Sequence, residues 1–380
     1  MKIKFFIFCL LFPLDAIAEL PLSAIDWLDE KRLGAIQFQN SEFSQDGEPP
    51  VSTAIEIPDI QVSSLTDKNN SAVGLLPPEV TGFPLNIWYR SNGEELLRLF
   101  KDLKVSNIPA IQRLVFRLLL TETEEPFNSD SEHSFLATRL EKLIEYGAVE
   151  PALALLKRAS PLPATLIPYL FDLSLLVENL APACEQVLQL GQDFPDDAAR
   201  IYCFARKGDW LTANLILETS AALGTLDQRE AALLHLFLET DIEDTLAAQL
   251  PPPSTLTPLE FRIYEAIGDP LSPSSLPRAF SSSDLSGNNG WKAQIKAAER
   301  LSATGALSDN RLLGIYTEHK PSASGAIWAR ASLIQKMEKA LVNNDTILIQ
   351  ETLNDLLTNP NYKSLLVPFA RIFSPRLLEI

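Results

Sequence analysis

The feature that most constrains the fold of this chain is the segment from Leu180 to Leu223, which reads LAPACEQVLQLGQDFPDDAARIYCFARKGDWLTANLILETSAAL. Its apolar residues recur at helical spacing in three short stretches, and glycine, proline and aspartate separate these stretches. A segment of this kind has too few residues between its stretches for long loops. It therefore predicts short helices that turn back on one another as stacked hairpins.

Two places in the chain share one turn pattern. In GDWLTA, Gly208 precedes Ala213 by five positions, and in GAVEPA, Gly147 precedes Ala152 by the same spacing. This pattern is typical of tetratricopeptide-like (TPR-like) repeats, in which glycine ends one helix and the small residue lets the next helix pack closely. We therefore expect the two turns to occupy equivalent places in two hairpins.

Helical patterning extends from about residue 92 to the C-terminus, and no run of alternating β-branched residues interrupts it. Expected helices in the middle and at the end of the chain cover residues 132–146, 149–159, 164–178, 181–191, 196–207, 209–222, 227–239, 257–267, 309–317, 323–342, 345–357 and 361–372. The passage from Asp269 to Gly290 is rich in proline, serine and glycine and is expected to be irregular. The predicted fold is all-α: a helical-hairpin (TPR-like) solenoid with antiparallel neighbours.

The prolines Pro251-Pro252-Pro253 interrupt this series of helices. We interpret them as a kink between two halves of one helical-repeat body, residues 79–250 and 251–380. A loose linker between independent domains would be longer and more polar.

The N-terminus has the pattern of a secretory signal peptide. Lys2 and Lys4 precede an apolar run from Phe5 to Leu14, and Ala16-Ile17-Ala18 offers a cleavage site between small residues. The run is shorter than the roughly 20 residues that a membrane-spanning helix needs. We expect residues 1–18 to be removed after Ala18, a periplasmic location, and no membrane span in the mature chain.

A short apolar motif, residues 19–38, follows the predicted signal peptide. Its centre contains Ile25, Trp27 and Leu28, and it precedes a polar stretch, residues 39–78, that has no helical period and is predicted to be a flexible linker. A short apolar motif on a flexible tether can dock onto a partner or onto the surface of the same protein. Alternatively, the three residues belong to an ordinary first helix packed on the core.

Composition and motifs exclude several classes of function. The net charge of −17 makes nucleic acid a poor partner, and basic pairs such as Lys157-Arg158 and Arg206-Lys207 have the pattern of solvated helix faces. The histidines stand alone, without metal-ligand spacing, and the chain contains neither a glycine-rich phosphate loop nor a G-x-S-x-G elbow. We expect no metal, no cofactor and no catalytic residues, so enzyme activity would require residues that meet only in the fold.

Two cysteines remain once the predicted signal peptide is removed, Cys184 and Cys203. They lie at equal distances from a turn centred between Asp193 and Phe194, so an antiparallel hairpin places them side by side. An exported chain meets an oxidising compartment, where neighbouring thiols tend to pair. The sequence therefore predicts a disulfide; the alternative is two buried free thiols.

Several strings of the chain resemble an uncharacterised family of exported alphaproteobacterial proteins that is sometimes labelled antifreeze-polyprotein-like. These strings are LPLSAIDWL, ACEQVL, RIYCFARKGDW, PLEFRIYEAIG, GWKAQIKAAERL and NRLLGIYTE. The resemblance covers nearly the whole mature chain and implies a bacterial periplasmic setting without an established active site. The expected architecture is also similar to the helical superhelix of soluble lytic transglycosylases, although their catalytic domain has no counterpart here.

Two functions from different classes follow from these observations. The first is a periplasmic scaffold, not an enzyme, that binds a protein or peptide partner of the cell envelope, with the Trp27 motif as a tethered ligand. The second is a cell-wall (peptidoglycan) enzyme or accessory whose superhelix holds a glycan against carboxylates such as Glu239, Asp241, Glu243 and Asp244. A cleft with two carboxylates about 5 to 9.5 Å apart would favour the second function.

Overall fold

The computed structural model describes residues 73–106, 108–124, 126, 134–159, 161–239, 250, 255–323 and 325–380, all of which belong to one unit of the chain, Ser64–Ile380. These residues form helices joined by turns, and an isolated β-bridge links Leu76 to Thr121. The all-α class is therefore confirmed for the described part. The predicted signal peptide and the motif of residues 19–38 lie outside it.

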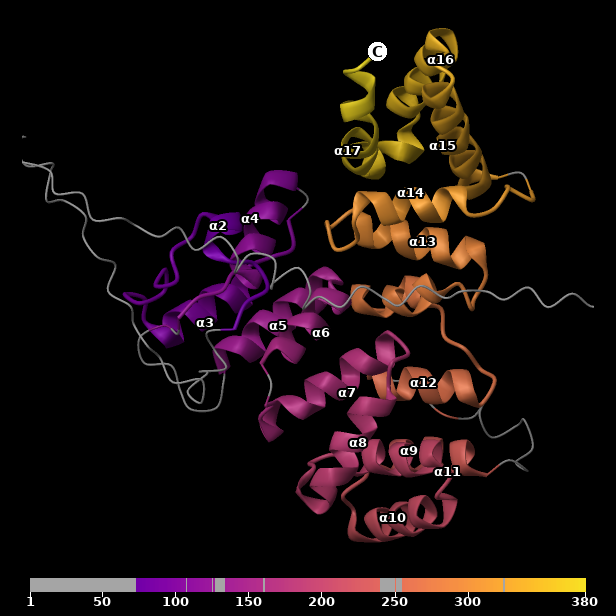
Figure 1. Ribbon diagram of the computed structural model, residues 1–380. Helices are drawn as coiled ribbons and strands as arrows, with labels where there is room; N and C mark the ends of the chain where they lie inside the picture. The colour runs from indigo at the N-terminus through magenta and orange to yellow at the C-terminus, as the bar shows by residue number, and fades with distance from the viewer. Residues whose placement is uncertain are drawn as a thin grey trace, which may run out of the picture. The chain divides into compact units, whose positions relative to one another are not determined.

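Figure 1 shows the helices along the chain. The α-helices are α2 (Pro78–Thr81), α3 (Gly93–Asp102), α4 (Pro109–Leu120), α5 (Ser134–Tyr146), α6 (Val149–Arg158), α7 (Ile167–Leu176), α8 (Ala181–Leu190), α9 (Asp197–Lys207), α10 (Trp210–Leu223), α11 (Gln228–Leu238), α12 (Pro258–Ala266), α13 (Trp291–Ser302), α14 (Asp309–Thr317), α15 (Ala326–Val342), α16 (Thr346–Thr358) and α17 (Leu366–Leu377). The 3₁₀ helices are η3 (Ala164–Leu166), η4 (Gly191–Asp193), η6 (Pro273–Ser275), η7 (Arg278–Ser286) and η8 (Pro360–Leu365).

The predicted linker, residues 39–78, ends earlier than expected. Leu75 and Leu76 donate backbone hydrogen bonds to the carbonyl of Leu120, at 2.8 and 2.9 Å. Gly74 lies so close to the chain after α4 that a Cβ there would stand 2.2 Å from the backbone of Glu122. The linker prediction is therefore wrong for residues 73–78, because this segment pairs with the end of α4 and is part of the packed body.

A buried arginine secures the same junction. Arg139 of α5 donates to the carbonyls of Leu119 at 2.8 Å, Val73 at 2.6 Å and Thr121 at 3.0 Å. Carbonyls at the C-terminus of a helix carry partial negative charge, so they solvate a cation that has left water. Burial lowers the pKa of the Arg139 guanidinium to about 10.

The two predicted glycine turns share one backbone conformation. Gly147 and Gly208 have φ values of +85° and +89°, a left-handed conformation that glycine adopts without steric cost. In each turn the glycine N–H bonds the carbonyl three residues earlier and the next N–H bonds the carbonyl five residues earlier. Ala152 and Ala213, five positions later, are fully buried. Asn344 makes the same turn between α15 and α16, with φ +50°.

In the series from α5 to α12, each helix packs on the one that follows it, up to the contact of α11 with α12. The chain also returns on itself: α12 packs on α7, and η7 packs on both α5 and α7 before α13 begins. In a simple solenoid each repeat contacts only its neighbours. The contacts of α12 and η7 with the earlier helices α5 and α7 are therefore not those of a simple solenoid.

The passage predicted to be irregular, residues 269–290, contains the 3₁₀ helix η7. Most side chains of η7 are buried. Short polar residues fit there because serine hydroxyls can satisfy nearby backbone groups: Ser283 Oγ donates to the Phe280 carbonyl at 2.7 Å. One apolar cluster runs from Val73 to Phe280 and a second from Leu285 to Phe373, so the two meet in η7. The proline run predicted to mark the kink, residues 251–253, lies outside the described residues.

Candidate functional site

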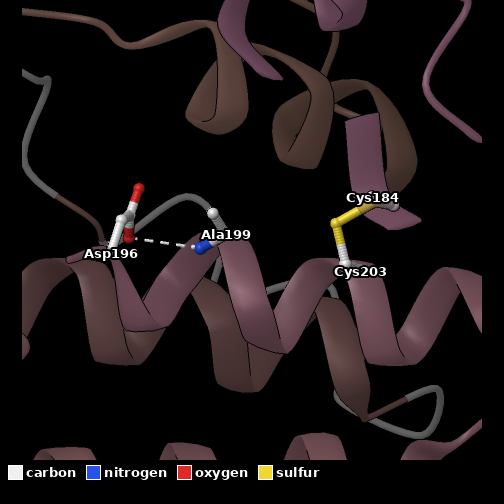
Figure 2. Close-up of a disulfide and its surroundings, with 4 residues drawn as sticks. All are labelled: Cys184, Asp196, Ala199 and Cys203. Atoms are coloured by element: carbon white, nitrogen blue, oxygen red, sulfur yellow. Dashed lines mark hydrogen bonds between the residues drawn. A yellow bond between two sulfur atoms is a disulfide. The ribbon is translucent and has the colours of Figure 1, made fainter. Parts of the chain in front are cut away.

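A disulfide joins α8 to α9, as the sequence predicts. Cys184 and Cys203 are bonded, with their Cα atoms 5.3 Å apart, and both are buried (Figure 2). The bond closes a loop with a sequence separation of 19 residues. It fixes the middle of α8 against the middle of α9.

Local sequence signals define both helices. Pro182 lies in the first turn of α8, where a missing N–H leaves no hydrogen bond unmade. Phe194 is buried in the turn, and the side chain of Asp196 caps α9 by accepting a hydrogen bond from the Ala199 N–H at 3.2 Å (Figure 2). Gly208 ends α9 in a left-handed cap.

An open groove of about 520 Å³ runs along this disulfide-linked pair. Its lining comes from α8 and the residue before it (Leu180, Ala181, Cys184, Glu185, Leu188, Gln189) and from α9 (Cys203, Arg206, Lys207). Leu180, Cys184 and Leu188 are four positions apart and therefore share one face of the chain. We call this the α8–α9 groove.

Two cations border the α8–α9 groove at the end of α9. Arg206 and Lys207 are exposed, and within the described part of the chain neither forms an ion pair or a side-chain hydrogen bond. Glu185 is the one carboxylate of the lining. Among its lining residues, the groove has neither a paired acid and base nor a nucleophile with a neighbouring base.

The outer face of α10, the helix that follows α9, is a second exposed apolar surface. Leu211 and Leu215, one helical turn apart, are 86% and 67% exposed, and Leu223 is also exposed. The opposite face of α10 packs on α9 and α11 through Ala213 and Leu217, both fully buried. Contiguous exposed apolar residues on a helix mark an interaction surface more often than isolated ones do.

Two carboxyls, Asp172 of α7 and Glu230 of α11, lie near the carboxyl of Asp196, the N-cap residue of α9. Burial, and secondarily the charge of Asp196, raises the pKa of Asp172 on α7 to about 7. The same two effects raise the pKa of Glu230 on α11 to about 7, and burial raises the pKa of Asp196 itself. Burial also raises the pKa of Asp197, but hydrogen bonds from Ser220, Thr225 and Arg200 outweigh it, so that this pKa is lowered overall. Asp172 and Glu230 therefore exchange protons near neutral pH.

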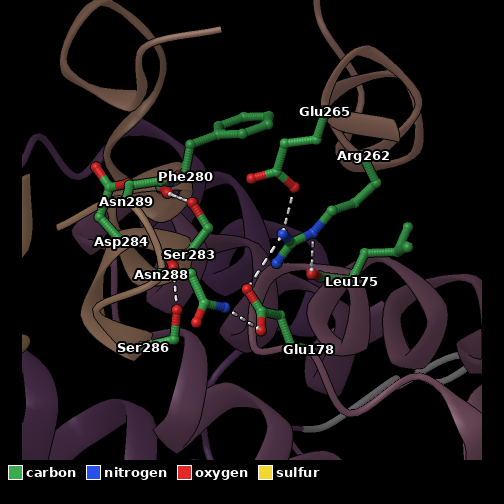
Figure 3. Close-up of polar contacts among 10 residues, drawn as sticks. All are labelled: Leu175, Glu178, Arg262, Glu265, Phe280, Ser283, Asp284, Ser286, Asn288 and Asn289. Atoms are coloured by element: carbon green, nitrogen blue, oxygen red, sulfur yellow. Dashed lines mark hydrogen bonds and ion pairs between the residues drawn. The ribbon is translucent and has the colours of Figure 1, made fainter. Parts of the chain in front are cut away.

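A separate ion network around the buried Arg262 holds the returning segments against α7 (Figure 3). Arg262 of α12 donates to the Leu175 carbonyl at 2.8 Å and pairs with Glu265 at 2.6 Å and Glu178 at 3.3 Å. Glu178 also accepts from Asn288 at 3.0 Å. The backbone of Glu178 is left-handed, with φ +59°, which is costly for a residue other than glycine. The network joins α7, α12 and the segment after η7.

A small polar pocket of about 120 Å³ adjoins this network, with Glu150, Glu178 and Arg311 in its lining. Glu150 pairs with Arg311 at 2.6 Å, and Glu178 pairs with Arg262. Both carboxylates are therefore already engaged by arginines. This arrangement is that of a structural contact between α6, α7 and α14.

Of the other predicted residues, the structure describes only Glu239. Ile25, Trp27 and Leu28 fall outside the described residues, as do three of the four carboxylates proposed for glycan binding, Asp241, Glu243 and Asp244. The fourth, Glu239, is the exposed C-cap of α11.

The two histidines that the structure describes are also isolated. His235 faces Glu218 at 3.8 Å, and the ring of His319 packs edge-on against Trp291. In the described ranges no three histidine, cysteine or acidic side chains gather in a way that could hold a metal ion. Within the same ranges, every helix is too short or too polar to cross a membrane.

The sequence predicts a solvated helix face at Arg206-Lys207 and does not predict the groove. The four-residue spacing of Leu180, Cys184 and Leu188 was a usable signal, because it places an apolar row beside the predicted disulfide. What the sequence could not show is that this row stays uncovered.

Comparisons of the chain with protein-family models, with curated proteins and with solved structures find no match.

Proposed function

We propose that this chain is a periplasmic scaffold of TPR-like helical hairpins that binds a protein or peptide partner in the cell envelope and has no catalysis of its own. The observation that carries this proposal is the disulfide-linked pair α8–α9, which leaves an apolar groove open to solvent, bordered by two cations that have no acidic partner among the described residues. The uncovered leucines of α10 extend the same hairpin's surface.

The repeated turn at Gly147, Gly208 and Asn344 supports the helical-hairpin part of the proposal. Each of these turns joins two helices that contact each other, α5 with α6, α9 with α10, and α15 with α16. Repeats of this kind present large surfaces without needing catalytic side chains.

Export is supported by the charged and apolar N-terminal pattern of residues 1–18 and by the disulfide, since such bonds persist in oxidising compartments. Mass spectrometry of protein isolated from its native host should find a mature N-terminus at Glu19. A chain that retains Met1 and remains reduced would contradict the periplasmic assignment.

A photocrosslinking experiment tests partner binding. A photoreactive phenylalanine analogue replaces Leu211, Leu215 or Gln189, one at a time, in protein expressed in its native host. These positions are exposed, so the replacement leaves the core intact. We expect discrete protein or peptide adducts from at least one position, and the same analogue at Lys157 serves as the control. Adducts from none of the positions, with export and folding normal, would contradict the proposed function.

A further inference from the structure

We infer that the α8–α9 groove takes a peptide segment that presents a large apolar side chain next to a carboxylate. This inference rests on the proposed function and names the chemistry of its partner. It follows from the two halves of the groove, one apolar and one cationic.

The apolar half is the row formed by Leu180, Cys184 and Leu188, which the bonded Cys203 closes from the side of α9. Because the disulfide fixes the two helices at this point, the groove exists before any partner arrives. Its volume of about 520 Å³ lies within the range of about 300 to 1,000 Å³ that ligand pockets occupy. An aromatic or long aliphatic side chain can therefore enter without displacing the helices.

The cationic half is the pair Arg206 and Lys207 in the last turn of α9. The negative end of the helix dipole stabilises cations at this position, so their presence alone does not imply a ligand. The chain, however, carries 49 acidic and 32 basic residues, and both side chains still lack an acidic partner among the residues that the structure describes. The groove lining has these two cations and one carboxylate, Glu185. Its net charge therefore favours a negatively charged group of the partner.

A second basic pair in the molecule provides a matched comparison. Lys157 and Arg158 end α6 as Arg206 and Lys207 end α9, and both pairs are exposed. Neither Lys157 nor Arg158 lines the α8–α9 groove. Reversing their charges changes the net charge of the protein by the same amount without touching the groove.

The experiment selects peptides from a phage-displayed library of random dodecapeptides on the exported, oxidised protein. Three forms are compared: the unaltered chain, the double variant R206E/K207E and the control K157E/R158E. We expect the unaltered chain and the control to enrich peptides in which a large apolar residue adjoins Asp or Glu. The groove variant should lose this enrichment.

Fluorescence anisotropy with one selected, labelled peptide then measures the effect. We expect R206E/K207E to bind about five- to tenfold more weakly than the unaltered chain, since each exposed charge contact contributes about 0.2 to 1 kcal/mol. K157E/R158E should stay within about twofold of the unaltered chain, because long-range charge effects are screened. Higher salt should weaken the unaltered complex and have little effect on the groove variant.

Enrichment of basic or purely polar peptides, equal losses in both double variants, or no enrichment at all would overturn the inference. If the selected peptides bind R206E/K207E as tightly as the unaltered chain, the proposed scaffold function stands and only the assignment of the site to this groove is wrong. Because Arg206 and Lys207 are exposed and unpaired, the variant should keep the circular dichroism spectrum and melting temperature of the unaltered chain. The milder R206Q/K207Q should show an intermediate loss, and an unchanged affinity there would also contradict the role of the two cations.

Discussion

The hairpins α5–α6 and α9–α10 share one turn and differ in what surrounds it. Both turns place glycine in the left-handed region, and both bury an alanine five residues later. At Gly147 a Cβ would stand 2.6 Å from Leu301 Cδ2 and 2.9 Å from Arg278 Cγ, whereas at Gly208 nothing lies within 4 Å. One sequence pattern therefore serves an interior hairpin and a peripheral one.

The difference follows from the return of the chain. The segments that come back after α12 cover the α5–α6 turn: Arg278 donates to the Glu145 carbonyl at 2.9 Å and Thr304 donates to the Tyr146 carbonyl at 2.8 Å. No described segment covers the outer face of α10 in this way, since Leu211 and Leu215 remain exposed. The returning segments therefore enclose the interior hairpin, and the peripheral one keeps an exposed outer face.

The largest expected effect is that of a methyl group at the two glycines. Gly147→Ala combines a left-handed alanine, which costs about 1 to 2 kcal/mol, with overpacking against Leu301 and Arg278, which costs about 1 to 3 kcal/mol more. Gly208→Ala bears only the first cost. Urea denaturation should show a free energy of unfolding lowered by about 3 kcal/mol for Gly147→Ala and by about 1 kcal/mol for Gly208→Ala. Equal losses would remove the distinction between the hairpins.

Removal of the disulfide should come next in size. The double variant C184S/C203S frees a loop of this length in the unfolded chain and should lose roughly 3 kcal/mol in the chain-entropy model. Hydrogen exchange should accelerate more in α8 to α10 than in α5 and α6, because the crosslink lies in the peripheral part.

The redox state itself can be checked independently. Alkylation of unfolded, unreduced protein isolated after export should add no alkyl group, and addition at both cysteines would contradict the bond. Uniform acceleration of exchange in the serine variant would instead show that the two hairpins unfold as a single unit.

A smaller effect concerns pH. The pKa of Asp172 is raised to about 7 in the folded protein, chiefly by burial, while in the unfolded chain it is near 4. The unfolded state therefore loses its proton first, and Asp172 destabilises the fold progressively as pH rises from about 4 to about 7, and constantly above that. Asp172→Asn should raise stability by about 1 to 2 kcal/mol at pH 8 and leave it nearly unchanged at pH 4.

Asp197→Asn should show the opposite sign. The pKa of Asp197 is lowered in the fold, so its contribution is present at neutral pH and is lost as the solution becomes acidic. Hydrogen exchange of α9 and α10 at several pH values distinguishes the two carboxyls. If Asp172→Asn leaves the pH dependence of stability unchanged, burial of that carboxyl has no energetic consequence.

The smallest effect is expected for the apolar motif near the N-terminus. Substitution of Trp27 and Leu28 by alanine should change the melting temperature of the helical body by less than about 1 °C, because contacts formed only in a complex do not enter the folding equilibrium. Crosslinking to the partner should decrease in the same variant. A clear fall in melting temperature would show that the motif belongs to the core.

The helices were predictable because their signals are local. The expected range 309–317 coincides with α14 (Asp309–Thr317), and the side chains of Asp196, Asp209 and Thr257 cap α9, α10 and α12 where the punctuation of the sequence places them. The turn between α8 and α9 is short, so counting residues from its centre was enough to pair Cys184 with Cys203.

The helix η7 and the packed start of the body were missed for the opposite reason. Arg278–Ser286 is helical although its residues are those of a loop, because burial between α5, α7 and α13 leaves its hydroxyls to bond neighbouring carbonyls. Residues 73–78 have few local signals of order. They are ordered by Leu120 and by Arg139, which are distant in sequence.

By itself, the sequence of this protein determined its helical class, its turns and its disulfide, since each depends on residues a few turns of helix apart. Only the tertiary structure decided that Gly147 is enclosed and Gly208 is open, that Asp172 and Glu230 both lie near Asp196, and that Arg206 and Lys207 border a groove. These properties depend on which segments return to cover a surface and which do not. Neither periodicity nor capping encodes that choice, because it is made by contacts between residues far apart in the chain.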